Sequence, residues 1–262
     1  YPLVLYLSSA RLWNENRTGE MEKIPSRTDA YQRCLDKERS SQSAFEYIKL
    51  LKNLSVEENW GAFLPSHETI MKAVQYSLQE ELQPEQQIIF SSRYGEIAIM
   101  EPDGTVIDFS ALSDGYRNVI KIVTDIATKM CILNPYLGEE ALEKTPGVVV
   151  IDELDLSLHP TWQKRIVRIL KELFPKIQFI CATHSPFIIQ SLEPGELFVL
   201  DAALDEEYSG QSIEDIAEDI MQVPVVRYSE KKQKMYEAAD AYFKALKKNV
   251  SSEELNELKT RL

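Results

Sequence analysis

The sequence predicts an α/β fold in which helices flank a parallel β-sheet. Apolar stretches suited to strands occupy residues 1–7, 147–151 and 177–183, and a helical pattern over 161–173 separates the last two. Strands and helices that alternate through short loops favour a parallel sheet with right-handed crossovers. A further apolar stretch at 196–201 is expected to add another strand.

The composition is typical of an ordinary soluble globular protein, with 262 residues, 44% hydrophobic residues and a formal net charge of -13. No apolar stretch approaches the roughly 20 residues of a membrane span, so we expect a cytoplasmic protein that does not enter a membrane. Cys34, Cys131 and Cys181 are too widely spaced for a paired metal-ligand motif and indicate a reducing compartment. The acidic balance argues against a surface that coats nucleic acid, but it leaves a local basic groove open.

Between the first strand and the later ones, the hydrophobic period changes twice. Residues 29–82 repeat apolar side chains at helical spacing, which predicts an inserted helical region. Residues 88–108 alternate with a period of two and contain Gly95 and Gly104 in turn sequences, which predicts an antiparallel meander. A long helix is expected to follow, ending near Asn134.

The central strand, residues 147–151, ends in two adjacent acids, Asp152 and Glu153. Its uninterrupted apolar run predicts a strand covered on both faces. Ligands bind at the carboxyl edge of such sheets, and adjacent strand residues point to opposite sides. One acid could therefore hold a magnesium ion while the other polarises a water molecule. The alternative is a strand that ends in a solvated acidic turn.

Four short motifs follow one another in a fixed order, each on its expected element. They are Leu-Ser-Asp-Gly-Tyr-Arg at 112–117, the strand ending at 152–153, Leu-Ser-Leu-His-Pro at 156–160, and Ala-Thr-His-Ser-Pro at 182–186. Together they resemble the ABC-type ATPase head of the RecF, SMC and OLD-like branch, which has a P-loop NTPase fold. The resemblance covers residues 85–201.

The first motif resembles the ABC signature, and the resemblance implies that it binds nucleotide. Ser113 and the Gly115 N–H, at a helix start, would form a phosphate site, which in this family meets the nucleotide of the opposite protomer. Asp114 and Tyr116 replace the glycine and glutamine of the transporter form. Asp114 is expected to point away from phosphate or to pair with Arg117. The alternative is an ordinary serine N-cap.

The resemblance also assigns roles to the other motifs. Asp152 would hold Mg²⁺ and Glu153 would be the catalytic base for ATP hydrolysis. His184 matches the catalytic switch histidine, although a histidine after a buried strand can also be a capping or core residue. His159 stands where many members of the family carry the D-loop aspartate and would communicate across the dimer at the nucleotide.

No Gly-x-x-x-x-Gly-Lys-Ser/Thr loop occurs in the sequence. The resemblance therefore implies that residues 1–201 are the carboxyl-terminal part of an ATPase head. Within them we expect a helical insertion at 26–84 and the signature, Walker B, D-loop and switch-histidine motifs at 85–201. Residues 202–262 are expected to form an acidic loop and a helical extension.

Further stretches, at 6–13, 26–31 and 34–36, are similar to the PtuA ATPases of Septu anti-phage systems, related forms of which accompany retrons. This likeness implies an ATPase that forms homodimers or higher oligomers around ATP and regulates an HNH nuclease partner. A retron reverse transcriptase with its RNA–DNA is a further partner that the likeness implies. The sequence shows neither a Toprim nuclease domain nor long heptad coiled coils.

Two other functions remain open. One is a scaffold that responds to nucleotide without useful turnover, and the other is a RecF-like DNA repair ATPase. Between residues 187 and 226 the chain has acidic residues but no Lys or Arg. That segment is either a solvated face or a docking surface for a basic partner.

Overall fold

The computed structural model describes residues 1–12, 21, 23–36, 42–54, 64–91, 93–200, 210–223 and 230–247. The chain divides into two compact units, Tyr1–Leu192 and Glu193–Leu262. Each unit is described separately below.

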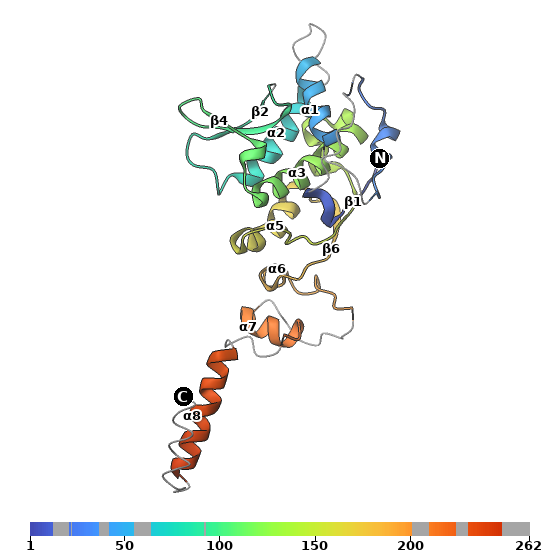
Figure 1. Cartoon of the computed structure of the whole chain (residues 1–262). Helices are drawn as coiled ribbons and strands as arrows, with labels where there is room; N and C mark the ends of the chain where they lie inside the picture. Colours follow the sequence, from blue (N-terminus) through green and yellow to red (C-terminus); the bar gives the residue numbers. More distant parts are fainter. Residues whose placement is uncertain are drawn as a thin grey trace. The chain divides into compact units, whose positions relative to one another are not determined.

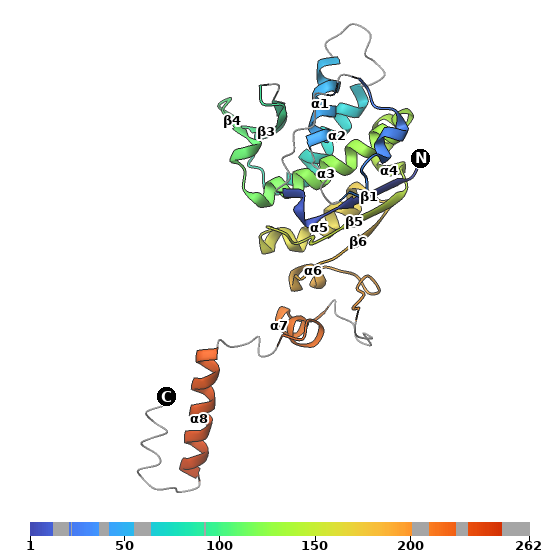
Figure 2. The same cartoon turned by 45° about the vertical axis from the view of Figure 1, so that its right-hand side comes forward.

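A parallel three-stranded sheet lies in the first unit (Figure 2), which confirms the predicted α/β class. In sheet order its strands are β1 (Leu3–Leu7), β5 (Gly147–Ile151) and β6 (Ile177–Cys181). Gly147 pairs with Leu3 in β1. A Cβ atom on Gly147 would lie 2.3 Å from the Leu3 carbonyl oxygen. Only glycine therefore allows β1 to approach β5 this closely.

One face of this sheet is buried along β1 and β5, while the β6 residues in register on that face, Ile177, Phe179 and Cys181, are half-buried or exposed. The buried side chains are those of Leu3, Leu5, Leu7, Val149 and Ile151. On the other face Val148 and Val150 are half-buried, while Val4 is 39% and Ile180 52% exposed. The prediction that the central strand is covered on both faces was therefore wrong. The buried face packs into the core formed with α3 (Asp114–Leu133) and α5 (Pro160–Leu173), which leaves the second face less covered.

Helix α3 is the centre of the core and packs against α1 (Gln42–Leu54) and α2 (Leu64–Leu78) (Figures 1 and 2). Its predicted apolar stripe is confirmed. The fully buried members are Val119, Ile122, Val123, Ile126, Met130 and Leu133. The helical patterns of α1 and α2 are confirmed in the same way, since Phe45, Ile48, Ile70 and Val74 are buried. The short helices α4 (Ala141–Lys144) and α6 (Pro186–Gln190) complete this unit.

The predicted antiparallel meander is confirmed. Its strands are β2 (Gln87–Ser91), β3 (Glu96–Met100) and β4 (Val106–Asp108). Gly95 and Gly104 have φ angles of 71° and 84°, in the left-handed region that glycine adopts without a steric penalty. The meander leads directly into α3 through Phe109–Ala111.

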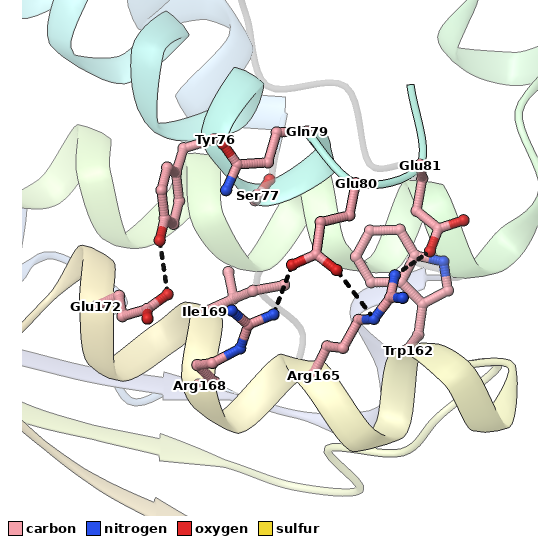
Figure 3. Close-up of a pocket in the computed structure, with 10 residues that line it drawn as sticks. All are labelled: Tyr76, Ser77, Gln79, Glu80, Glu81, Trp162, Arg165, Arg168, Ile169 and Glu172. Carbon is pink, nitrogen blue, oxygen red and sulfur yellow. Dashed lines mark hydrogen bonds and ion pairs between the residues drawn. The ribbon is translucent and has the colours of Figure 1, made fainter. Parts of the chain in front are cut away.

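The α2–α5 ion-pair network consists of Glu80, Glu81, Arg165 and Arg168 (Figure 3). Glu80 lies 3.3 Å from Arg165 and 2.5 Å from Arg168, and Glu81 lies 2.7 Å from Arg165. The two acids follow α2 and both arginines are on α5. The network therefore ties the end of the helical insertion to the helix that follows the Asp152–Glu153 turn.

In the second unit, residues 196–200 form no strand with the described residues. The prediction of a strand at 196–201 was therefore wrong, and Asp201 lies outside the described residues. Phe198 is 82% and Leu200 86% exposed. The helices of this unit are α7 (Ile213–Asp215), a π-helical turn at Ile216–Ile220, and α8 (Glu230–Lys247). Most of the predicted acidic loop, at 201–209, and the tail after residue 247 lie outside the described residues.

Within the described parts of the chain, we find no helix whose length and apolar character would let it cross a membrane.

Candidate functional site

The carboxylate turn, residues 152–158, lies where the three parallel strands end. The Asp152 N–H donates to the Leu7 carbonyl at the end of β1, at 2.9 Å. The Leu154 N–H donates to the Ala182 carbonyl just beyond β6, also at 2.9 Å. These bonds attach the turn to both neighbours of β5. Asp152 and Glu153 therefore lie at the carboxyl edge of the sheet, where α/β proteins bind ligands.

The backbone of the carboxylate turn is not a continuation of the strand. Glu153 has a φ of 48° and Ser157 a φ of 57°, both in the left-handed region. Non-glycine residues pay about 1–3 kcal/mol for such conformations and keep them only when surrounding contacts hold them. The expected strand alternation therefore does not set the directions of the Asp152 and Glu153 side chains, because β5 ends at Ile151.

The Asp152 and Glu153 side chains are half-buried, and neither carboxylate accepts a hydrogen bond from the residues that the structure describes. The buried guanidinium of Arg11 holds the backbone instead, donating to the Asp152 carbonyl at 2.6 Å and the Glu153 carbonyl at 2.8 Å. Burial lowers the pKa of Arg11 to about 10, although the two nearby acids act in the opposite direction. Arg11 therefore stays charged at neutral pH beside two carboxylates that are free for a ligand.

These carboxylates fit a magnesium ion. Magnesium prefers hard oxygen ligands and is usually held by one or two carboxylates together with water and phosphate oxygens. Among the described residues no group of three or more His, Cys, Asp and Glu side chains could hold a metal by itself. The donor set at Asp152 and Glu153 is thus of the kind that shares a metal with a phosphate ligand.

Helix α3 begins beside the carboxylate turn. Ser113 is its N-cap, and the serine hydroxyl oxygen lies 3.5 Å from the Tyr116 N–H. A Cβ atom on Gly115 would lie 3.2 Å from the Ser157 carbonyl oxygen, so the helix start packs tightly on the turn. The N-terminus of a long helix favours an anion. The structure therefore places the signature sequence and the two acids in one region.

The other signature residues have partners within the chain. Asp114 and Arg117 form an ion pair, one of the two arrangements expected from the sequence. The Tyr116 and Trp162 rings form a T-shaped pair, with ring centres 5.8 Å apart and an angle of 73° between their planes. The pairing of Asp114 with an arginine reduces the repulsion that this acid would exert on a phosphate.

His184 lies just beyond β6 and its side chain is exposed. Its backbone N–H donates to Asp155 Oδ1 at 3.2 Å, and the Thr183 hydroxyl donates to the same oxygen at 2.5 Å. Asp155 belongs to the carboxylate turn. The structure therefore brings His184 next to the edge that carries Asp152 and Glu153.

His159 is also exposed and caps α5. Its Nδ1 atom lies 3.3 Å from the Thr161 N–H, which donates to it. This is the local role that a histidine at an N-cap can fill. Its role in communication between nucleotide sites remains a prediction.

Sequence reasoning did not identify three polar residues that shape the site: Arg11, Asn118 and Asp155. Arg11 lies in the 6–13 stretch that is similar to PtuA ATPases, but that likeness assigns it no role. Asn118 stood out as an amide near the start of an otherwise apolar helix face. Asp155 follows Glu153 in Asp-Glu-Leu-Asp, and its position two residues after the second acid was the available signal.

Residues 101–190 match the family described as "AAA domain, putative AbiEii toxin, Type IV TA system". All the site residues predicted from the motifs, from Ser113 to His184, lie inside this stretch. The match covers less than half of the 262 residues.

Two curated proteins are similar over part of the chain. A Retron Vc95 probable ATPase from Vibrio cholerae serotype O1 biovar El Tor is 42% identical over 99 residues, which are 38% of this chain and 19% of that protein. A Septu protein PtuA from Bacillus mycoides (strain KBAB4) is 46% identical over 89 residues, 34% of this chain and 12% of that protein. The matched part therefore spans about a fifth or less of these relatives.

Among solved structures, an SMC head bound to the C-winged helix domain of ScpA aligns with a TM-score of 0.38 and 19% identity. The alignment covers 56% of this chain and 43% of that chain. This likeness is too weak to add to the strand order and helix packing described above. Over part of its length the chain is similar to the retron ATPase and the Septu protein PtuA, and the predicted resemblance to PtuA-like ATPases is confirmed for that part.

Proposed function

We propose that this chain is part of an ATP-binding and ATP-hydrolysing subunit of a bacterial anti-phage defence complex. The observation that carries the proposal is the carboxylate turn itself. It presents Asp152 and Glu153 without described hydrogen-bond partners, at the carboxyl edge of a parallel sheet and beside the N-terminus of α3. The similarity to ATPases of retron and Septu systems supports the choice of reaction and of biological setting.

Each residue has a distinct task in this proposal. Asp152 would hold Mg²⁺, which when bound neutralises charge on the phosphates. Glu153 accepts a proton from the attacking water and orients it, and His184 contacts the terminal phosphate from the end of β6. The Ser113 hydroxyl and the Gly115 N–H receive a phosphate oxygen at the start of α3. Phosphoryl transfer depends mainly on such positioning and charge stabilisation.

We further propose that two copies sandwich ATP, with the signature of one copy meeting the nucleotide held by the other. His159, exposed at the start of α5, would contact the second copy. The assembled dimer or higher oligomer would control a partner nuclease of the HNH class, and in a retron setting a reverse transcriptase with its RNA–DNA. The names of the relatives give only the retron and Septu settings, and the partners themselves are those that the family resemblance implies.

The decisive experiment compares Glu153→Gln with Glu143→Gln in the natural polypeptide that contains these residues. Removing a general base lowers turnover by about 10²–10⁴-fold, so Glu153→Gln should lose hydrolysis, keep ATP binding and accumulate as an ATP-bound dimer. Glu143 is exposed on α4, so Glu143→Gln makes the same chemical change outside the carboxylate turn. Its variant should hydrolyse ATP at the wild-type rate.

The same measurements separate this proposal from a scaffold without turnover. The sequence lacks a Gly-x-x-x-x-Gly-Lys-Ser/Thr loop, which is the feature that favours the scaffold. If the wild-type protein binds ATP but its hydrolysis is no faster than that of Glu153→Gln, the scaffold is correct. Equal hydrolysis by Glu153→Gln and Glu143→Gln, at a substantial rate, would instead remove Glu153 from the mechanism.

A further inference from the structure

Arg11 and Asn118 form a buried polar bridge between the carboxylate turn and helix α3. Arg11 is 3% exposed and Asn118 is fully buried. Arg11 Nε donates to Asn118 Oδ1 at 2.7 Å, and Asn118 Nδ2 donates to the Leu156 carbonyl at 2.6 Å. Together with the bonds from Arg11 to the Asp152 and Glu153 carbonyls, these bonds form a continuous path from the start of the turn to Leu156 through one side chain of α3.

Four of the five N–H donors of Arg11 bond to described residues. Besides its bonds to Asn118, Asp152 and Glu153, its Nη1 atom donates to the Ser8 carbonyl at 3.1 Å. The guanidinium is buried and its contacts at the turn are with backbone oxygens, so it is not placed to bind a nucleotide directly. A planar fork of fixed N–H directions is what such simultaneous contacts require. Arg11 therefore acts on the two acids through their backbone.

Asn118 connects this bridge to the proposed phosphate site. It lies on the second turn of α3, after the Ser113 N-cap and Gly115, and Gly115 itself packs on the Ser157 carbonyl. A movement at the start of α3 must therefore move Asn118 or break its bonds to Arg11 and Leu156. Buried polar networks of this kind are costly to leave partly satisfied, so the turn and the helix start move together.

We propose that Arg11 and Asn118 are positioning residues that fix the Asp152 and Glu153 backbone and make its geometry depend on the phosphate-binding end of α3. The catalytic part of this inference rests on the proposed ATPase function, whereas its structural part rests on the hydrogen bonds alone. The bridge would regulate the site by reporting a ligand at the signature to the two acids of the same chain.

The first test measures hydrogen exchange of the 152–158 amides in the natural protein without nucleotide. Arg11→Lys keeps the charge, but a single ammonium cannot contact the Asp152 carbonyl, the Glu153 carbonyl and Asn118 together. We expect exchange in this segment to accelerate at least about tenfold. The matched control is Arg168→Lys on the exposed face of α5, where the arginine side chain is 53% exposed. It should leave exchange at 152–158 unchanged.

The second test measures steady-state ATP hydrolysis by the same variants. Arg11→Lys should lower kcat by about 10–100-fold and change KM for ATP by less than about threefold, because displaced catalytic groups slow chemistry without weakening binding. Asn118→Asp keeps an acceptor for Arg11 but cannot donate to Leu156, so it should lower kcat as well. The double variant should lose less than the two single losses combined, since both break one path.

The outcomes separate this inference from the proposed function. Unchanged exchange at 152–158 in Arg11→Lys overturns the inference whether or not the protein hydrolyses ATP. If exchange accelerates while the wild-type protein shows no turnover, the bridge stands and the ATPase function fails. Accelerated exchange with wild-type kcat, or a loss confined to KM, overturns the positioning role in catalysis. If circular dichroism shows that Arg11→Lys is unfolded, both tests are made with Asn118→Asp instead, and the same outcomes apply.

Discussion

The Asp155 carboxylate accepts a hydrogen bond from the Thr183 hydroxyl at 2.5 Å and another from the His184 N–H at 3.2 Å, through the same oxygen. Asp155 lies in the carboxylate turn, and the other two residues lie just beyond β6. One side chain therefore sets the distance between the two acids at the end of β5 and the histidine at the end of β6.

This contact predicts a difference between two substitutions of Asp155. Asp155→Ala leaves the Thr183 hydroxyl and the His184 N–H without their acceptor, which costs about 1–3 kcal/mol. Asp155→Asn keeps an acceptor oxygen in place and should cost clearly less. Hydrogen exchange of the 182–185 amides in the natural protein measures the effect of each substitution. If Asn and Ala accelerate exchange equally, the Asp155 oxygen is not what holds this segment.

Substituting Gly147 should separate β1 from β5. The added Cβ of Gly147→Ala would lie 2.3 Å from the Leu3 carbonyl oxygen and 2.7 Å from the Leu3 Cβ, and neither atom belongs to a flexible side-chain end. We expect the free energy of unfolding to fall by about 3 kcal/mol, at the upper end of overpacking effects. Urea unfolding of the natural protein provides the measurement.

Gly210→Ala is the control for that experiment. A Cβ atom on Gly210 would meet no atom of the described residues within 4 Å, so the same chemical change should alter the free energy of unfolding by no more than about 0.5 kcal/mol. If Gly147→Ala and Gly210→Ala lower the free energy of unfolding by similar amounts, the close approach of β1 to β5 does not require a glycine at position 147.

Histidine 67 predicts a specific pH dependence of stability. Burial, and next the charge of Lys52, lower the pKa of His67, while Glu68 acts in the opposite direction. The unfolded chain therefore binds a proton more readily than the folded one, so stability is lost as the pH falls through about 6.5. His67→Gln removes this contribution. As the pH is lowered from neutral to about 5, the Tm of the wild type should fall by more than the Tm of His67→Gln.

The surroundings of the His67 Nε2 atom explain why protonation of the imidazole destabilises the folded chain. His67 Nε2 has no hydrogen-bond partner among the described residues, so a proton added there has no acceptor. If the Tm difference between wild type and His67→Gln is the same at both pH values, the imidazole titrates as it does in the unfolded chain.

The α2–α5 ion-pair network should contribute little, and only at low salt. Glu80, Arg165 and Arg168 all have substantially exposed side chains, and exposed pairs are screened by salt. Glu80→Gln should therefore lower Tm slightly at low ionic strength and not at high ionic strength. Glu143→Gln, which changes an exposed acid outside the network, is the matched control. A large and salt-independent effect of Glu80→Gln would show that the network fixes the packing of α5.

The elements set by local patterns could be predicted from the sequence. The stripe of α3 and the alternation in β2 and β3 depend on neighbours within a few residues, so periodicity was sufficient. The position of Asp152 and Glu153 followed from a general rule about sheet edges. The strand expected at 196–201 failed because a strand also needs a hydrogen-bonding neighbour, which an apolar pattern does not specify.

The remaining parts of the site depend on contacts between distant segments. Arg11 reaches the carboxylate turn only because β1 pairs with β5, and Asn118 reaches Leu156 only because α3 packs against that turn. Arg11 lies in the 6–13 stretch and Asn118 directly follows the 112–117 motif, but neither position has a role that the sequence pattern assigns. The incomplete burial of β5 was missed for the same reason, since the sequence of a strand does not show how many of its faces are covered.

The pairing of Leu3 with Gly147 has a consequence for the order of folding. Strands β5 and β6 are joined by a single helix, whereas β1 meets β5 only after a far longer loop has closed, and loop closure costs more entropy as the loop lengthens. We expect β5, α5 and β6 to assemble first and β1 to dock late. Arg11 follows β1 directly, so the backbone of the two acids would be locked only when the chain has nearly reached its native state.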